Sequence, residues 1–382
     1  METAQTKLRI LHVISNLEVG GAEMNLLRLV QSMPKEFDNP VVSLTTIGPV
    51  GEKIRDLGAH VQALSMKKGV PDPRGAMKLA GIVNRFQPDI IQCWMYHANL
   101  LGLAVSRGRR LVWNIRCTDM DLGRYGMIYR WTVRTGALFS FLPDAVVVNS
   151  LAGRDFHASL GYSPKKWDVI TNGFDTAVYR PEASWRQHVR SELAIPGNAP
   201  VIGIVNRYDP MKGHATFFRA ASLLSQANEA VHFVLAGRGM TGNNPEISSS
   251  LGAMKNKRNI HLLGERDDIP QVLNALDIAT SSSIYGEGLP NAIGEAMATG
   301  IPCVVTDAGD SALLVGDTGI VVPKRDPEAL CSAWQRLLDA GIDFRKTMGE
   351  RARKRIMGHY SLQAMIRRYE ALYINLITNR ES

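Results

Sequence analysis

Short apolar runs rich in β-branched residues alternate with longer amphipathic stretches along almost the whole chain. This alternation is typical of β-α-β units, in which helices connect parallel strands. It occurs in two series. The first predicts strands at Leu8–Ser15, Pro40–Thr45, Ile90–Trp94, Leu111–Ile115, Ala145–Asn149 and Trp167–Thr171. Helices such as Ala22–Met33 and Pro73–Phe86 separate these strands. The second predicts strands at Val201–Asn206, Val231–Ala236, Ile260–Leu263, Ile278–Ser281, Pro302–Thr306 and Gly319–Val322.

The polar segment Asn172–Pro200, which contains several Gly and Pro residues, separates the two series and is predicted to be the linker. A length of 382 residues fits two domains of ordinary size. The domain boundary is therefore placed near Gly173, giving domains at 1–173 and 174–360. An amphipathic tail from Ser361 to about Thr378 is expected to return to the first domain.

The composition is that of a folded protein, with 45% apolar and 21% charged residues. The cysteines lack the spacing of a disulfide framework or a zinc site, which favours a reducing compartment; they are Cys93, Cys117, Cys303 and Cys331. The apolar run near the N-terminus is short and interrupted by His12, so it is interpreted as a strand rather than a signal peptide. No stretch is apolar enough to span a membrane, and a cytoplasmic location is expected.

The net charge of +8 lies almost entirely in the first half of the chain. Residues 1–180 carry 22 Lys and Arg against 15 Asp and Glu, and residues 181–382 carry 22 against 21. Such an excess predicts an anionic partner: a phosphorylated substrate, an acidic membrane surface or a nucleic acid. Nucleic acid ranks last, because basic stripes interleaved with aromatics are not apparent.

The strongest local motif is GEGLPNAIGEAMATG at residues 286–300, which follows a predicted strand. Glu287 in the loop is placed to hold ligand hydroxyls, and Glu295, two turns into the next helix, to accept from a ribose diol. Gly288, Leu289, Pro290 and Asn291 would lead into the helix, whose first N–H groups suit a phosphate. The alternative is a glycine-rich turn with two solvated glutamates. Function is favoured because Glu295 stands among apolar residues and needs a partner there.

A second motif, NRYDPMKGH at residues 206–214, follows the first strand of the second series. Arg207 and Lys212 flank its turn and can converge on a departing diphosphate, since open α/β sheets bind ligands at the carboxyl ends of strands. The alternative is a solvated pair of cations in a loop.

Three further features are weaker. Gly20 and Gly21, between the first strand and helix, would let backbone approach a phosphate, although a plain tight turn fits equally well. His97 begins a helix after a strand, but a lone His is more often structural. Asp119-Met120-Asp121 resembles a metal-binding DxD motif, but a loop is favoured because no further ligand cluster is visible.

The segment Arg124–Leu142 mixes aromatic and aliphatic residues with three arginines. This composition occurs in helices that lie at membrane interfaces. An ordinary domain helix whose arginines form the solvated face explains it too, and is favoured.

In these motifs the sequence resembles the retaining glycosyltransferases of family 4, also called group 1, whose fold is GT-B. The resemblance covers nearly the whole chain and rests on motifs that occur in the family's order: Gly20–Glu23, Tyr96-His97, Asn172–Asp175, Arg207 to Lys212, Gly264–Arg266 and Glu287 to Glu295. It implies two Rossmann-like domains facing each other across a cleft. The C-terminal helix, about 361–382, would return to an acceptor-binding N-terminal domain, and 174–360 would bind the donor.

The resemblance also implies roles for single residues. Arg207 and Lys212 would neutralise the diphosphate of a nucleotide sugar, helped by Gly20–Gly21 and the amides of Leu289–Asn291. Glu295 would bind the ribose, and backbone around Glu265–Arg266 the base. Glu287 would hold hydroxyls of the donor sugar, with His97 nearby. The reaction would be a front-face displacement in which the acceptor's proton passes to the leaving phosphate, with no metal or other cofactor required.

The acceptor side varies within the family. Trp94, Arg116 and the Arg124–Leu142 segment are the candidates for acceptor or membrane contact. The expected acceptor is a saccharide or polyprenyl-diphosphate-linked saccharide at the cytosolic face of the membrane, in cell-surface polysaccharide or lipopolysaccharide assembly, with a UDP-sugar as donor.

Two other functions fit the same pattern. One is a nucleotide-sugar epimerase or hydrolase, which would consume the donor alone; the other is a non-catalytic subunit that binds sugar nucleotides. The charged set of Arg207, Lys212, Glu287 and Glu295 disfavours the second. A nicotinamide dehydrogenase is disfavoured because the GxGxxG fingerprint is missing.

Overall fold

The computed structural model describes residues 7–67, 72–252, 254 and 257–378. The chain divides into two compact units. The N-terminal unit runs up to Gly173 and takes up the chain again from Leu362, and the C-terminal unit is Phe174–Ser361. The division falls where the sequence places the boundary.

The N-terminal unit is built on an eight-stranded parallel sheet within the described residues, in the order β4-β3-β1-β5-β6-β7-β8 with β2 beside β1. Its strands are β1 (Leu8–Ile14), β2 (Phe37–Asp38), β3 (Val41–Ser43), β4 (Val61–Ala63), β5 (Ile90–Trp94), β6 (Arg110–Ile115), β7 (Ala145–Val148) and β8 (Trp167–Val169). Its helices are α1 (Gly21–Ser32), α2 (Gly48–Asp56), α3 (Pro73–Phe86), α4 (Tyr96–Val105), η1 (Leu122–Arg124), α5 (Met127–Phe139), α6 (Leu151–Ser159) and α15 (Leu362–Thr378).

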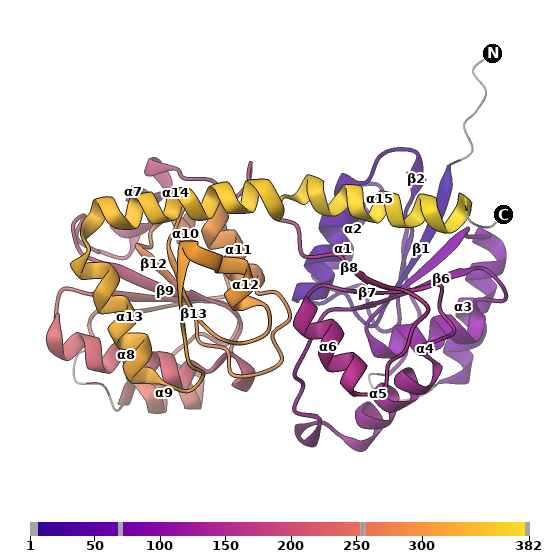
Figure 1. Cartoon of the computed structure of the whole chain (residues 1–382), viewed down its shortest axis with the longest axis horizontal. Helices are drawn as coiled ribbons and strands as arrows, with labels where there is room; N and C mark the ends of the chain where they lie inside the picture. Colours follow the sequence, from indigo (N-terminus) through magenta and orange to yellow (C-terminus); the bar gives the residue numbers. More distant parts are fainter. Residues whose placement is uncertain (1–6, 68–71, 253, 255–256, 379–382) are drawn as a thin grey trace, which may run out of the picture. The chain divides into compact units, whose positions relative to one another are not determined.

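Side chains of each strand alternate between the two faces of this sheet, and each face buries an apolar layer. Along β1, Ile10 and Ile14 belong to the layer under α1, α2 and α15, whereas Leu11 and Val13 belong to the layer under α3, α4 and α5. Figure 1 shows these two groups of helices on opposite sides of the sheet. Because both faces are covered, the strands are almost continuously apolar.

The C-terminal unit contains a six-stranded parallel sheet in the order β11-β10-β9-β12-β13-β14, with helices on both faces (Figure 1). The strands are β9 (Val201–Val205), β10 (His232–Ala236), β11 (Ile260–Gly264), β12 (Ile278–Ser281), β13 (Cys303–Thr306) and β14 (Gly319–Val322). The helices are α7 (Ala183–Glu192), η2 (Pro210–Lys212), α8 (His214–Ala227), α9 (Pro245–Gly252), α10 (Ile269–Asn274), α11 (Asn291–Ala298), α12 (Ser311–Val315), η3 (Gly316–Thr318), α13 (Pro327–Asp339) and α14 (Gly341–His359).

In each sheet the chain reverses its direction of winding once. The reversal falls between β1 and β5 in the N-terminal unit and between β9 and β12 in the C-terminal unit. Loops that leave neighbouring strands at such a point diverge to opposite faces and leave a crevice at the strands' carboxyl ends. The loops after these four strands are therefore where a ligand is expected.

The C-terminal helix α15 packs in the N-terminal unit, as the sequence predicts. The hydroxyl of Tyr369 accepts a hydrogen bond from the Asn114 side chain at 2.7 Å, and the hydroxyl of Tyr373 donates one to Gln92 at 2.6 Å. Both tyrosines are buried. Both tyrosine hydroxyls of this buried interface therefore have side-chain partners. The two-sheet α/β architecture expected from the sequence is confirmed.

The sequence analysis missed β2, β4 and α7. The two strands have two and three residues, too few to show a period. Helix α7 lies inside the predicted linker and lacks an apolar stripe. Ion pairs anchor much of it instead: Arg186 and Arg190 each bind a carboxylate oxygen of Asp277 at 2.7 Å. A helix anchored by charge leaves no hydrophobic periodicity to detect.

Gly294 in α11 tests this packing. A Cβ there would stand 2.0 Å from the ring of Phe174, which is fully buried in the same unit. We expect Gly294→Val to destabilise the C-terminal unit by about 1–3 kcal/mol through overpacking. Gly358→Ala, at an exposed site with nothing within 4 Å, should leave the melting temperature unchanged or raise it. Equal melting temperatures for Gly294→Val and the parent protein would contradict this packing.

Candidate functional site

The predicted charged residues of the C-terminal unit lie on the loops that flank its switch point. Arg207 follows β9, Lys212 ends the short helix η2 in the same loop, and Glu287 stands in the loop after β12. Lys212 Nζ lies 2.5 Å from Glu287 Oε2, and both side chains are largely buried. The structure thus brings together one cation and one carboxylate that are 75 residues apart in the sequence.

Backbone contacts hold the two loops against each other. The backbone N–H of Ile284 donates to the carbonyl of Met211 at 2.8 Å, and the Ser282 hydroxyl donates to the carbonyl of Lys212 at 2.8 Å. Gly213 has φ +64°, and a Cβ on it would stand 2.1 Å from the carbonyl oxygen of Ser282. Only glycine permits this approach, so the backbone holds the loops that carry Lys212 and Glu287 next to each other.

Glu287 is held in its ionised form. Burial raises the pKa of its carboxyl, but the charge and hydrogen bond of Lys212, a hydrogen bond from Ser283 and the charge of Arg207 outweigh burial and lower the pKa below its usual value. The Ser283 hydroxyl donates to Glu287 Oε2 at 2.9 Å. At neutral pH Glu287 is therefore a hydrogen-bond acceptor, suited to hold hydroxyl groups and unable to donate a proton.

The loop after β9 has its own supports. Arg207 pairs with Asp209 at 3.0 Å and is partly exposed, so its guanidinium remains accessible. His214 Nε2 lies 2.7 Å from the side-chain oxygen of Asn206, and burial together with Lys212 lowers the pKa of His214 to about 4. A neutral His214 thus fixes the start of this loop without adding charge to it.

The other predicted donor-site residues of this unit lie at the same edge of the sheet. Pro290 is the N-cap of α11, and Glu295 lies one turn into that helix, not two as expected from the sequence, because the helix begins only at Asn291; its side chain is mostly buried. Gly288, Leu289 and Asn291 surround the helix start. Arg266, just after β11, pairs with Glu192 and Asp268 at 2.6 and 2.7 Å. The Arg266 side chain is therefore occupied by ion pairs. The sequence analysis assigns base binding to the backbone around Glu265–Arg266, and this role stays a prediction.

In the N-terminal unit the corresponding positions hold Gly20, Gly21 and His97. Gly20 precedes α1, which has no side-chain cap at its N-terminus. His97 is the second residue of α4, and the preceding turn places Met95 at φ +71°, a conformation that is costly for a side chain of its size. Burial lowers the pKa of His97, and its Nε2 is buried without a hydrogen-bond partner within the described residues. The strained turn thus presents a neutral imidazole at this sheet edge.

The structure corrects one of the two single-residue candidates for acceptor contact. Trp94 is completely buried, and its indole N–H donates to His12 Nδ1 at 3.3 Å. The guanidinium of Arg116 lies over the Trp94 ring and donates to Asn172 and to the hydroxyl of Tyr369. Both side chains therefore stabilise the interior around α15. Trp94 offers no surface to an acceptor, whereas Arg116 is only partly buried and its contact with an acceptor stays a prediction.

Sequence reasoning also missed a residue. Ser283 binds Glu287 directly, and the signal was present as the Ser281–Ser283 run at the end of a buried strand, where hydroxyl groups need partners.

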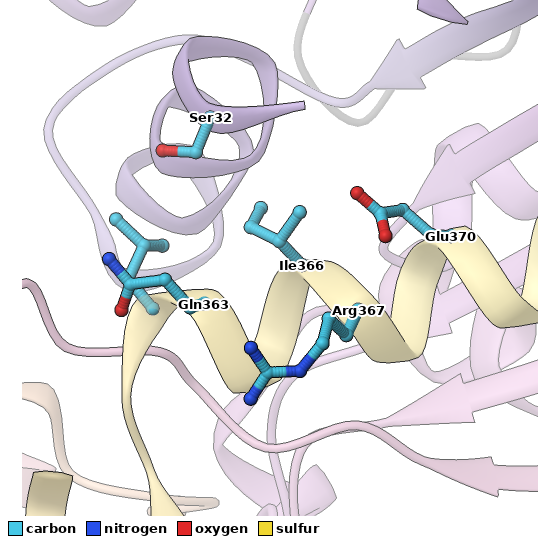
Figure 2. A pocket seen from close by; sticks show the side chains of 6 residues that line it. Ser32, Gln363, Ile366, Arg367 and Glu370 are labelled. Atoms are coloured by element: carbon cyan, nitrogen blue, oxygen red, sulfur yellow. The ribbon is translucent and has the colours of Figure 1, made fainter. Parts of the chain in front are cut away.

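One surface pocket of the N-terminal unit lies between α1 and α15 (Figure 2). It contains none of the predicted site residues; its lining is Ser32, Leu362, Gln363, Ile366, Arg367 and Glu370. No group of three or more potential metal-ligating side chains occurs in the part of the chain that the structure describes.

Two family models match the sequence in tandem. One, described as Glycosyltransferase Family 4, matches residues 19–178, and the other, described as Glycosyl transferases group 1, matches residues 199–340. The chain belongs to this family of glycosyltransferases.

The relatives agree with this assignment. The chain is 29% identical to the UDP-Gal:alpha-D-GlcNAc-diphosphoundecaprenol alpha-1,3-galactosyltransferase of Escherichia coli, with 100% of both chains covered. It is 25% identical to the putative glycosyltransferase EpsF of Bacillus subtilis, over 78% of this chain and 79% of that one. The fold matches Alr3699/HepE of Anabaena, crystallised with UDP-glucose, with a TM-score of 0.83 at 21% identity over 96% and 99% of the two chains. The architecture is thus GT-B.

The ion pair predicts a specific pH dependence of stability. Lys212→Met leaves the Glu287 carboxylate buried without its cation, which should destabilise the protein by about 3 kcal/mol at neutral pH. In the parent protein the depressed pKa of Glu287 contributes stability above the unfolded pKa of about 4.3, and this is lost as the pH falls through the folded pKa. In the variant the pKa of Glu287 rises. The loss of stability relative to the parent protein should therefore become smaller once acid protonates Glu287.

Thermal unfolding of the parent protein and the variant, followed from neutral to acidic pH, measures this difference in stability. Adding Glu287→Gln to Lys212→Met removes the unpaired charge and should recover part of the loss at neutral pH. A deficit that is independent of pH and unchanged by Glu287→Gln would mean that the pair is not coupled.

Proposed function

We propose that this protein is a retaining glycosyltransferase that transfers a hexose or N-acetylhexosamine from a UDP-sugar to a saccharide or lipid-linked saccharide. The observation that carries the proposal is the Lys212–Glu287 contact at the switch point of the C-terminal unit. It places a cation suited to a leaving diphosphate beside an ionised carboxylate suited to sugar hydroxyls. The family assignment supplies the reaction class.

The choice of substrates rests on relatives. The galactosyltransferase of Escherichia coli is named for a UDP-Gal donor and an acceptor attached to diphosphoundecaprenol, and it aligns over the full length of both chains. The Anabaena protein of the same fold was crystallised with UDP-glucose. We therefore propose a UDP-sugar as donor, a polyprenyl-diphosphate-linked saccharide as acceptor, and a role in the assembly of cell-surface polysaccharide or lipopolysaccharide.

In the proposed mechanism Arg207 and Lys212 neutralise the charge that develops on the diphosphate as the glycosidic bond breaks. The ammonium group of Lys212 has three N–H donors, so it can keep its contact with Glu287 while it binds a phosphate oxygen. Glu287 holds hydroxyls of the donor sugar and Glu295 the ribose. The acceptor hydroxyl enters on the face from which the diphosphate leaves, and its proton passes to the leaving phosphate. His97 and the Gly20–Gly21 turn are proposed to serve the same substrate.

We propose that no metal ion takes part, because the role proposed for Arg207 and Lys212, neutralising the diphosphate, is the one a divalent ion would otherwise have. Activity should then persist when EDTA is present throughout the assay. Loss of activity with EDTA that added Mg²⁺ or Mn²⁺ restores would contradict this part of the proposal.

The proposed place of action is the cytosolic face of the membrane. None of the helices that the structure describes is long and apolar enough to cross a bilayer. Residues 1–180 contain 22 basic and 15 acidic residues, and this excess of positive charge favours peripheral attachment to an anionic surface.

Substitution of the paired residues tests the proposed chemistry. We expect Lys212→Ala and Glu287→Ala each to lower kcat/KM for transfer by on the order of a hundredfold or more, because each removes one preorganised contact to the donor. Lys346→Ala and Glu350→Ala change exposed residues of α14 in the same unit and should leave transfer unchanged. Wild-type rates in both site variants would refute the assigned roles.

The reaction itself is followed by NMR with a UDP-sugar and a polyprenyl-diphosphate-linked saccharide. The expected product keeps the donor's anomeric configuration, and the donor should remain intact when no acceptor is added. Rapid turnover of the donor alone would identify an epimerase or hydrolase instead, and an inverted product would exclude the front-face mechanism.

A further inference from the structure

Helix α5 and the turn that follows it expose an unusual number of large apolar side chains. Met127 is 72% exposed, Trp131 58% and Leu138 67%. We call this exposed set the α5 surface; it comprises Met127, Ile128, Arg130, Trp131, Arg134, Leu138, Phe139, Phe141 and Leu142. A contiguous group of exposed apolar side chains on a protein surface often indicates a binding site for another molecule or a membrane.

The apolar residues of the α5 surface are not the buried stripe of an ordinary amphipathic helix. The inward positions of α5 are Thr132, Val133 and Gly136, and these are buried. Met127, Trp131 and Leu138 follow the outward face at spacings of four and seven residues, which repeats after one and two turns of a helix. The helix therefore has a packed inner face and a second apolar face that points away from the core of its own unit.

The charge on this surface has one sign. Between Leu122 and Pro143 the sequence contains three arginines and no Asp or Glu. The guanidinium of Arg134 lies 6.0 Å from the centre of the Trp131 ring, and Arg130 is exposed beside them. Arginines beside aromatic side chains fit the boundary of an anionic bilayer, where the rings enter the headgroup region and the guanidinium groups bind lipid phosphates.

We propose that the α5 surface binds an anionic lipid bilayer, with α5 parallel to the membrane plane and Trp131, Leu138 and Phe141 inserted at the interface. The chemistry favours a bilayer over a protein partner, because every charge within the surface is positive and the apolar side chains stand between the charges. Only an occupant that is anionic and apolar at once satisfies both sets of groups, and an acidic bilayer provides both across its whole area.

The inner face of α5 connects this surface to the candidate site. Tyr129 packs edge-to-face on Tyr96 with 5.6 Å between the ring centres, and its ring centre is 6.1 Å from that of His97. The helix that would lie on the lipid thus contacts the start of α4, where His97 stands. Resting on the proposed function, this contact would bring His97 near the surface that carries a lipid-linked acceptor.

Vesicle flotation tests the proposal without donor or acceptor, so its outcome does not depend on catalysis. The parent protein should float with vesicles of phosphatidylcholine and phosphatidylglycerol, bind pure phosphatidylcholine far less, and be released by high salt. Trp131→Ser with Leu138→Ser, and separately Arg130→Gln with Arg134→Gln, should each lower the partition coefficient by about tenfold or more.

A matched control is Met77→Ser with Arg74→Gln, which removes one exposed apolar and one exposed basic side chain from α3 of the same unit. It should bind vesicles like the parent protein, and unchanged melting temperatures would show that all variants fold. Absence of binding to anionic vesicles by the parent protein, or an equal loss in the control, would overturn the proposal.

A transfer assay separates this proposal from the proposed function. With an acceptor shortened enough to dissolve in water, the α5 variants should transfer at the parent rate, and with the acceptor in anionic vesicles they should transfer more slowly. Vesicle binding without transfer by the parent protein would contradict the proposed function alone. Full transfer to vesicle-bound acceptor by both α5 variants would contradict the membrane surface alone.

Discussion

The contact between Lys212 and Glu287 is the interaction on which the candidate site depends. Two opposite charges, both largely buried, are stable only when each has its partner, because an unpaired charge in the interior loses its hydration without compensation. The 2.5 Å separation is possible because backbone approaches backbone: Gly213 lets the first loop reach Ser282, and Gly309 lies so close to Glu287 that a Cβ would meet its carbonyl oxygen at 1.7 Å. These two glycines therefore allow the loops that carry Lys212 and Glu287 to come together.

Strand order decides where these loops meet. In both sheets the residues with candidate chemistry follow the strands beside the point of reversal, β9 and β12 in one unit and β1 and β5 in the other. The C-terminal unit supplies charge there, and the N-terminal unit supplies a neutral imidazole after the strained turn at Met95. The residues at the two switch points therefore differ in kind: charged side chains in the C-terminal unit and an uncharged imidazole in the N-terminal unit.

The sequence predicted those features that have a local signal. The strand Ile90–Trp94 and the helix Pro73–Phe86 are predicted with their observed limits, because a short apolar run interrupted only by Gln92 identifies the strand and a clear helical period identifies the helix. Arg207, Lys212 and Glu287 are predicted because strand ends in open sheets bind ligands, and the structure brings Lys212 and Glu287 into contact. The sequence could not show that α7 is anchored by Asp277, that Ser283 binds Glu287, or that Trp94 and Arg116 contact Tyr369 of α15. Those partners are far apart in the chain, and only tertiary packing reveals them.

The most direct measurement is a crystal structure of the protein with an unreactive UDP-sugar analogue. The account predicts that Arg207 and Lys212 contact the diphosphate oxygens, while Glu287 accepts hydrogen bonds from hydroxyls of the sugar and Glu295 from the ribose. A diphosphate bound out of reach of both cations, with the Lys212–Glu287 pair undisturbed, would contradict it.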